Sequence, residues 1–223
     1  MLIVGMTFLS ACASIQTEVP AKTEVKAEGD ENKTESVDGA VKEGALPMQP
    51  RVAAPDPMKD TDVPLELIKA YDQVKGYLKD KNVDQAIQHL ESIKANFPKH
   101  SGPSYRLARL YLQKKAYDTA LDAVETAISI NTSNYYAQNL KGVILREQGK
   151  FIEAKDAYAK AIDIYPDYAQ AHLNLGILSD IYLYDLNTAL QHYETYMLLT
   201  SNEDKTVEGW LIDLKRRMPQ GAE

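Results

Sequence analysis

The residue types that perform most covalent and metal-based chemistry are few in this sequence. It contains a single cysteine, Cys12, and four histidines, which are His89, His100, His172 and His192. It has no glycine-rich phosphate loop, paired-acid motif or histidine pair at metal-ligand spacing. One cysteine excludes an internal disulfide and a multi-thiolate metal site. The sequence therefore predicts a protein that is not an enzyme, with no catalytic residue, metal site or cofactor.

Cys12 follows a short apolar run at the start of the chain. Residues 2–9 carry no charge, and they are far fewer than the ~20 residues that a membrane-spanning helix needs. The residues Leu9-Ser10-Ala11-Cys12 resemble the lipobox of bacterial lipoproteins. This resemblance implies that residues 1–11 are a signal peptide, that Cys12 carries fatty acyl chains such as palmitate, and that Ala13 directs sorting to the outer membrane. The alternative is that Cys12 is an ordinary thiol.

Residues 12–62 have the composition of a flexible tether. After Cys12 the segment is rich in Glu, Lys, Thr, Ala, Gly and Pro, and it contains no aromatic residue. Such a composition does not bury enough apolar surface to offset chain entropy, so we expect a disordered linker. About 50 residues of flexible coil span roughly 40 Å. The segment is predicted to be a spacer, with a binding segment for the cell wall or a partner as the alternative.

The rest of the chain is organised by a 34-residue period. Ala86, Ala120, Ala154 and Ala189 are separated by 34, 34 and 35 residues, and each precedes a larger residue by four positions. Small residues at a fixed period allow two helices to approach closely, while the larger ones fill the adjacent space. Proline, glycine and asparagine lie between the expected helices, where they mark helix ends. The pattern predicts an array of helix pairs.

These repeats resemble the tetratricopeptide repeat, a helix-turn-helix unit of 34 residues. The best-matched stretch runs from Tyr135 to Pro166 and carries the family positions Gly142, Phe151, Ala154, Tyr158, Ala161 and Pro166. The resemblance implies an all-α superhelix of about four repeats over residues 63–202. The fourth repeat has one extra residue, which we place within Tyr182–Asp185, between its two helices. Residues 203–218 show an amphipathic stripe, which predicts a C-terminal capping helix.

The repeat frame also gives an expectation for the histidines. His89 and His192 occupy equivalent positions in repeats that lie far apart, which predicts surface residues and not a ligand pair. His172 stands where the family usually has tryptophan, and it is expected to be packed in the first helix of its repeat.

The resemblance further implies where a partner binds. In this family the first helix of each repeat lines a concave groove that holds a protein or peptide. The inward positions, carried onto this sequence, are Tyr71, Lys75, Tyr105, Arg109, Tyr136, Asn139, Val143, Arg146, Leu173 and Ile177. Tyrosine combines a rigid apolar ring with a polar hydroxyl, which suits an interface. The alternative for each tyrosine is packing between neighbouring helices.

Together these features predict a lipoprotein scaffold or adaptor on the periplasmic face of the outer membrane of a Gram-negative bacterium. Candidate processes are assembly of an envelope complex, such as a pilus, secretion or TonB-like system, and cell-wall synthesis. The net charge of −7 argues against nucleic acid as a partner. The alternative function is recognition of peptidoglycan or another glycan, with tyrosines as platforms for the sugar rings.

Overall fold

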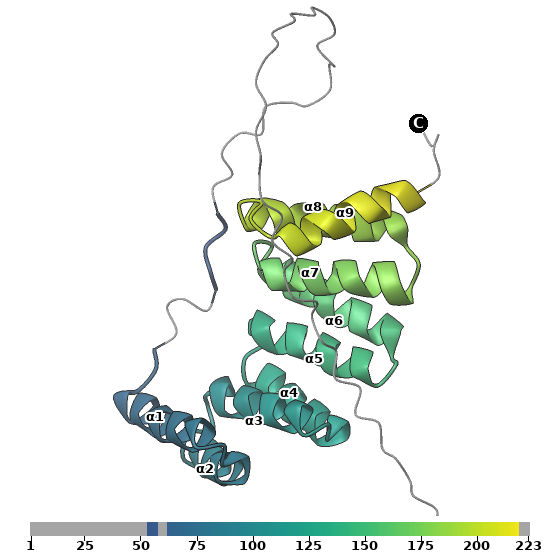
Figure 1. Ribbon diagram of the computed structural model, residues 1–223. Helices are drawn as coiled ribbons and strands as arrows, with labels where there is room; N and C mark the ends of the chain where they lie inside the picture. The colour runs from purple at the N-terminus through teal and green to yellow at the C-terminus, as the bar shows by residue number, and fades with distance from the viewer. Residues whose placement is uncertain (1–52, 58–61, 219–223) are drawn as a thin grey trace, which may run out of the picture. The chain divides into compact units, whose positions relative to one another are not determined.

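The computed structural model describes residues 53–57 and 62–218, and the regular structure in this range is helical. The predicted signal peptide, Cys12 and most of the predicted tether lie outside the described residues. The helices are α1 (Leu65–Lys79), α2 (Val83–Asn96), α3 (Ser101–Gln113), α4 (Tyr117–Ile130), α5 (Tyr135–Glu147), α6 (Phe151–Ile164), α7 (Ala169–Ile177), η1 (Leu178–Tyr182), α8 (Leu186–Leu199) and α9 (Lys205–Arg217). Consecutive helices pair as hairpins, and the hairpins stack in chain order (Figure 1).

The periodic alanines lie at the closest helix contacts. Ala86, Ala120, Ala154 and Ala189 begin the buried stripe of the second helix in each pair, and all four are 0% exposed. A methyl side chain at this position lets the second helix pack closely on its neighbours. The 34-residue period therefore marks the four repeats, and the all-α prediction is confirmed.

Side-chain size is complementary between the two helices of a repeat. In the third repeat, Gly142 of α5 lies under the ring of Tyr158 of α6, and in the fourth, Gly176 lies under Tyr193. The second repeat has alanine and valine at the matching positions, Ala108 and Val124, and the first has valine and leucine. All of these residues are buried. The glycines are therefore packing residues that make room for a large ring.

The turn between the two helices of each repeat requires a left-handed backbone at one position. The residues there are Lys81, Lys115, Gly149 and Tyr184, with φ between 54° and 75°. In the first three turns the next amide donates to a carbonyl five residues earlier, at 2.8 to 2.9 Å, which closes the helix end. Only the third turn has glycine, the residue that adopts a positive φ without steric cost.

The extra residue of the fourth repeat lies earlier than predicted. It is wound into the π-helical segment η1, where the amide of Leu183 donates to the carbonyl of Leu178 at 3.1 Å. The prediction of a longer turn within Tyr182–Asp185 was wrong, because a π turn absorbs one residue and keeps the backbone amides hydrogen-bonded. The first helix of this repeat is therefore α7 continued by η1.

The C-terminal helix α9 covers the last repeat. Its Val207 and Leu214 are at most 1% exposed and join a cluster formed by residues of α8. Asp204 caps the helix by accepting a hydrogen bond from the amide of Val207 at 3.2 Å. At the other end, Arg217 pairs with the buried Asp180 of η1 at 2.7 Å. These contacts confirm the predicted capping helix.

Candidate functional site

A recess of about 740 Å³ opens between the first repeat and α3, and we call it the leucine cleft. Its walls come mainly from α1 and α3, the first helices of repeats one and two, and from residues of α2 and the turn before it. Its lining is mostly apolar and consists of Val74, Leu78, Lys81, Val83, Leu90, Arg106, Arg109, Leu110, Leu112, Gln113 and Leu140. Such a surface is suited to aliphatic side chains of a partner.

Two arginines of α3 add positive charge to this apolar cleft. The guanidinium carbon of Arg106 lies 4.2 Å from the centroid of the Tyr71 ring, within cation–π distance. Arg109 is exposed, and its guanidinium carbon lies 6.0 Å from the centroid of Tyr105. Within the described residues neither arginine forms an ion pair. The cleft therefore combines aliphatic walls with two guanidinium groups that can donate hydrogen bonds to a carboxylate.

A second recess of about 400 Å³ shares these arginines, and we call it the tyrosine recess. Its lining is Val63, Leu67, Tyr71, Lys99, His100, Ser101, Gly102, Tyr105, Arg106, Arg109, Asn131, Asn134 and Tyr136. Burial raises the pKa of the Tyr71 and Tyr105 hydroxyls, and the neighbouring arginines oppose this rise. These tyrosines are therefore neutral hydrogen-bonding groups across the physiological pH range.

Four of the ten predicted groove residues lie together in the structure. Tyr71, Tyr105, Arg109 and Tyr136 line the tyrosine recess, and Arg109 also lines the leucine cleft. Tyr136 is 37% exposed, and the other two tyrosines are half-buried. The arrangement leaves one tyrosine ring and one guanidinium accessible to a partner on this side of the repeats.

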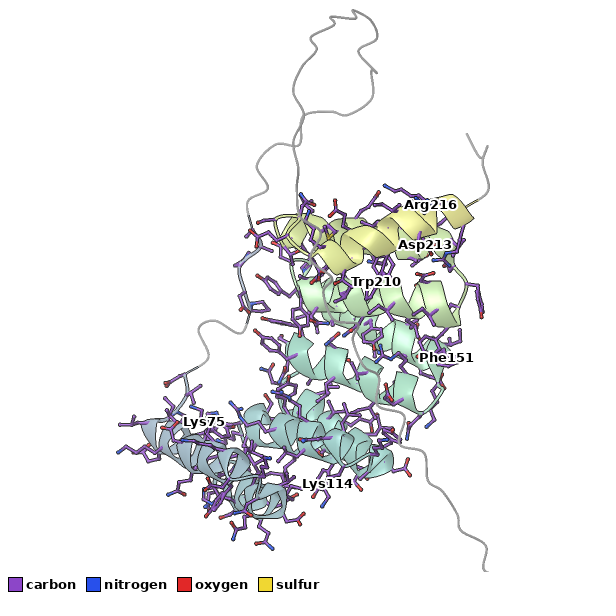
Figure 2. All side chains as sticks on the ribbon, viewed as in Figure 1. Lys75, Lys114, Phe151, Trp210, Asp213 and Arg216 are labelled. Carbon is purple, nitrogen blue, oxygen red and sulfur yellow. The ribbon has the colours of Figure 1, made fainter. Side chains whose placement is uncertain are left out.

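Two further predicted groove residues form local ion pairs outside both recesses. Lys75 is exposed on α1, where it pairs with Asp72 at 2.8 Å (Figure 2). Arg146 is half-buried on α5 and pairs with the adjacent Glu147 at 3.2 Å.

The remaining four predicted groove residues contribute to packing. Asn139 is 7% exposed and accepts a hydrogen bond from the amide of Asn174 at 2.9 Å, which links α5 to α7. Val143, Leu173 and Ile177 are half-buried and pack against core clusters. The cross-repeat amide bond explains why a polar residue is tolerated at a buried position.

Two histidines that the sequence interpretation treated separately meet within the fourth repeat. His172 Nδ1 of α7 lies 2.9 Å from His192 Nδ1 of α8. His172 is 6% exposed, as expected for a packed residue. The prediction that His192 is a surface residue was wrong: its ring is half-buried because it faces α7 instead of solvent.

The hydrogen bonds of this pair define its tautomers. His172 Nε2 lies 3.0 Å from the carbonyl oxygen of Pro166, which only accepts, so Nε2 carries the proton. In neutral His172, Nδ1 then accepts from the Nδ1–H of His192. Burial, followed by the influence of His172 and Lys155, lowers the pKa of His192 to about 4. His192 is therefore neutral at pH 7, and its ring forms a structural contact with His172.

This depressed pKa predicts that acid weakens the fourth repeat. An unfolded histidine titrates near 6.5, so between about pH 6.5 and 4 the unfolded chain binds the additional proton. The stabilisation is fully present above pH 6.5 and is lost as the pH falls through this window. It amounts to at most about 3 kcal/mol, and solvent screening of a half-buried ring reduces it to about 1 to 2 kcal/mol.

Urea unfolding of His192→Gln at pH 7.5 and pH 5 measures this effect. The variant is expected to lose less stability than the natural protein between these two pH values. Gln191→Ala, which changes an exposed side chain that does not titrate on the same helix, is the control and is expected to follow the natural protein. If the free energy of unfolding changes by the same amount between the two pH values in the natural protein and in His192→Gln, the prediction is wrong.

Within residues 53–57 and 62–218, no group of three or more His, Cys, Asp or Glu side chains could hold a metal ion. In the same part of the chain, no helix combines the length and the apolar character that crossing a bilayer requires.

The helix arrangement is shared with known repeat proteins. Residues 66–175 match the family model of the tetratricopeptide repeat-like domain. The solved structure of pilF from Pseudomonas aeruginosa has a TM-score of 0.61 with 22% identity, covering 68% of each chain. MamA from Desulfovibrio magneticus RS-1 has a TM-score of 0.59 with 15% identity, covering 70% of this chain and 87% of that chain. The described helices therefore have the fold of a tetratricopeptide-repeat solenoid.

The curated relatives match only over a few repeats. The peroxisomal targeting signal receptor of Candida albicans is 31% identical over 71 residues, which are 32% of this chain and 12% of the receptor. Across the curated relatives, the matched segments amount to 9 to 19% of their lengths. The tetratricopeptide repeat-like domain suggests a scaffold for protein–protein interaction.

The sequence interpretation missed a group of packed aromatic rings, which we call the tyrosine cluster. It consists of Tyr105, Tyr135, Tyr136, Tyr165 and Tyr168 of the second to fourth repeats. Three of its members are not at inward positions of a first helix, so the repeat frame did not select them. The available signal was the concentration of tyrosines just before and at the start of α5 and α7.

Proposed function

We propose that the protein is a lipid-anchored scaffold on the periplasmic face of the outer membrane, and that its leucine cleft captures a protein partner. The partner segment presents aliphatic side chains and at least one carboxylate. The scaffold serves the assembly of an envelope complex, such as a pilus, secretion or TonB-like system, or the cell-wall machinery. The lipid at Cys12 sets the location, the tether gives reach, and the repeat domain selects the partner.

The observation that carries the partner proposal is the charge of the cleft. The whole chain has a net charge of −7, yet Lys81, Arg106 and Arg109 all line this one apolar recess. A carboxylate placed between the two guanidiniums gains charge-assisted hydrogen bonds, and the leucine walls remove apolar side chains from water. Local positive charge on an acidic protein also steers an acidic partner segment to this surface.

The support for the anchor is the sequence Leu9-Ser10-Ala11-Cys12 after an apolar run. Two or three acyl chains on one cysteine give lasting membrane attachment, whereas a single chain gives marginal attachment.

Site-specific photo-crosslinking of the full-length protein in cells tests the proposal. Benzoylphenylalanine replaces Leu112, a wall residue of the leucine cleft, or Ile152, which is 63% exposed on α6. A crosslinked protein product is expected from position 112 and not from position 152. Arg109→Glu is expected to reduce that product about ten-fold, because a carboxylate replaces a guanidinium at the interface.

The controls separate charge, anchoring and ligand class. Lys160→Glu makes the same charge change on an exposed site of α6 and is expected to leave the crosslink unchanged. Cys12→Ala is expected to release the protein from the membrane fraction and to abolish labelling with a fatty-acid analogue. Binding to purified sacculi that is lost in Tyr105→Ala, without any protein crosslink, supports the glycan alternative and rejects the scaffold.

A further inference from the structure

A short segment that precedes α1 lies on the repeat domain. Residues 53–57, Ala-Ala-Pro-Asp-Pro, run beside the N-terminal end of α5 and the turn before α7 (Figure 1). The amide of Ala54 donates a hydrogen bond to Asp167 Oδ2. The hydroxyl of Tyr135 donates a hydrogen bond to Asp56 Oδ2 at 3.1 Å. The segment is thus held at two points, once by its backbone and once by its carboxylate.

The surface that receives the segment is the tyrosine cluster. The ring of Tyr135 lies at the centre, with its centroid 4.1 Å from Tyr136, 4.7 Å from Tyr168 and 4.9 Å from Tyr165. Tyr136 and Tyr168 are also in contact, at 5.3 Å. Tyr135 and Tyr136 lie at the start of α5, and Tyr165 and Tyr168 lie around the turn before α7. Their rings pack against one another across these two segments. The cluster is therefore a preformed aromatic surface.

The raised pKa of the Tyr135 hydroxyl is consistent with its hydrogen bond to Asp56 of the segment. Burial, together with the adjacent hydroxyl of Tyr136 and the Asp56 carboxylate, raises the pKa of Tyr135 well above its ordinary value. The Tyr135 hydroxyl therefore keeps its proton, which it donates to Asp56. Two residues earlier in the segment, Asp167 Oδ2 accepts a hydrogen bond from the backbone amide of Ala54. The surface thus offers one donor and one acceptor beside stacked rings.

The segment itself is suited to such a surface. Pro55 and Pro57 fix their own φ near −65°, and a residue that precedes proline favours an extended conformation, which restricts Ala54 and Asp56. An extended proline-containing segment loses little conformational entropy on binding, which is why aromatic grooves bind such segments well. The aspartate between the prolines supplies the specific polar contact.

We propose that the tyrosine cluster is a peptide-binding site for extended segments in which an aspartate lies between two prolines, and that residues 53–57 are its intramolecular ligand. This site is separate from the leucine cleft. A partner segment of the same chemistry binds by displacing residues 53–57. The internal ligand has the advantage of its linkage, since a short tether gives an effective concentration of roughly millimolar. The unmodified protein therefore binds an external peptide weakly, and loss of the internal contact exposes the site.

Fluorescence anisotropy with a labelled Ala-Ala-Pro-Asp-Pro peptide tests this competition. The titrations use the full-length protein, its Asp56→Ala variant and the double variant Asp56→Ala/Tyr135→Phe. Asp56→Ala is expected to raise the apparent peptide affinity by about ten-fold or more, since the internal ligand is weakened. Adding Tyr135→Phe is expected to lower that affinity by about five-fold, because the ring remains but the donor to the aspartate is lost.

Two controls make the result specific. Asp62→Ala removes an exposed carboxylate from the same stretch of chain and is expected to leave peptide affinity as in the natural protein. The peptide Ala-Ala-Pro-Ala-Pro is expected to bind the Asp56→Ala variant at least about five-fold more weakly than the aspartate peptide. Equal peptide affinity in the natural protein and Asp56→Ala overturns the proposal. Binding that is insensitive to both Tyr135→Phe and the loss of the peptide's aspartate also overturns it, as does a lack of binding to every variant.

Amide hydrogen exchange gives a measurement that needs no added peptide. In the natural protein, exchange of the Ala54 amide is expected to be slowed by its bond to Asp167. Asp56→Ala is expected to speed this exchange about ten-fold or more, as the segment leaves the surface. An unchanged exchange rate in Asp56→Ala contradicts the role of Asp56 in holding the segment.

Discussion

Replacing Gly142 with alanine is expected to lower the free energy of unfolding by about 2 to 3 kcal/mol. A Cβ atom at this position would lie 2.5 Å from Cδ1 and Cε1 of the Tyr158 ring. That ring is 0% exposed and stands between α5 and α6, so it has no free space into which it can move. The added methyl group therefore pushes apart the two helices of the third repeat. Urea unfolding followed by circular dichroism measures the loss.

A matched glycine variant separates this packing cost from the intrinsic effect of alanine in a helix. Gly209 is in the interior of α9, and a Cβ atom there would meet nothing within 4 Å. Gly209→Ala is expected to raise the free energy of unfolding by about 0.5 to 1 kcal/mol, because alanine loses less backbone entropy than glycine. If both alanine variants stabilise the protein, the close approach of Gly142 to Tyr158 is not present in solution.

The second repeat suggests a rescue of the Gly142 variant. It has Ala108 opposite Val124 at the positions where the third repeat has Gly142 opposite Tyr158. In the double variant Gly142→Ala/Tyr158→Val, the two residues reproduce that pair. The double variant is expected to lose less free energy of unfolding than the two single variants lose together. The difference, which is the coupling energy, is expected to be about 1 kcal/mol or more. If the stability changes of the two single variants simply add in the double variant, the side-chain sizes at positions 142 and 158 are not coupled.

The repeat architecture was predictable because it depends on residues that recur. Ala86 and its three equivalents must be small wherever helices meet closely, and that requirement leaves a 34-residue period in the sequence. The capping helix was predictable for a similar reason, since Val207 and Leu214 form a helical stripe that a solenoid end needs. Both are properties of a helix face, which sequence spacing reports directly.

The features that the sequence did not reveal depend on contacts between non-equivalent positions. His172 and His192 meet because α7 and α8 pack side by side, whereas a repeat alignment compares His192 with His89 in another hairpin. The extra residue of the fourth repeat shows in the spacing, but spacing does not distinguish a longer turn from the π turn η1.

The candidate binding surfaces were only partly predictable for the same reason. The groove positions included four residues that line the tyrosine recess, which are Tyr71, Tyr105, Arg109 and Tyr136. The leucine cleft follows from the separation of α1 and α3, and helical periodicity does not determine that separation. Residues 53–57 have the composition of a tether, and their position on the tyrosine cluster depends on two specific hydrogen bonds.

Truncating Leu214 to alanine is expected to lower the free energy of unfolding of the last repeat and α9 by about 3 kcal/mol. Leu214 is 0% exposed and packs in one cluster with Tyr193, Met197 and Val207, so its removal leaves a cavity under the capping helix. Trp210, the single tryptophan, also lies on α9, with its ring centroid 5.8 Å from Tyr193 (Figure 2). Tryptophan fluorescence therefore reports specifically on the docking of α9.

A control on the same helix distinguishes lost packing from a change in helix propensity. Ile212 is 51% exposed on the other side of α9, and Ile212→Ala is expected to change stability by less than about 0.5 kcal/mol. In Leu214→Ala, the fluorescence transition is expected to occur at a lower urea concentration than the circular dichroism transition, because each repeat of a solenoid is stabilised mainly by its neighbours. If the fluorescence transitions of Leu214→Ala and Ile212→Ala have the same urea midpoint, α9 does not cap the solenoid in solution.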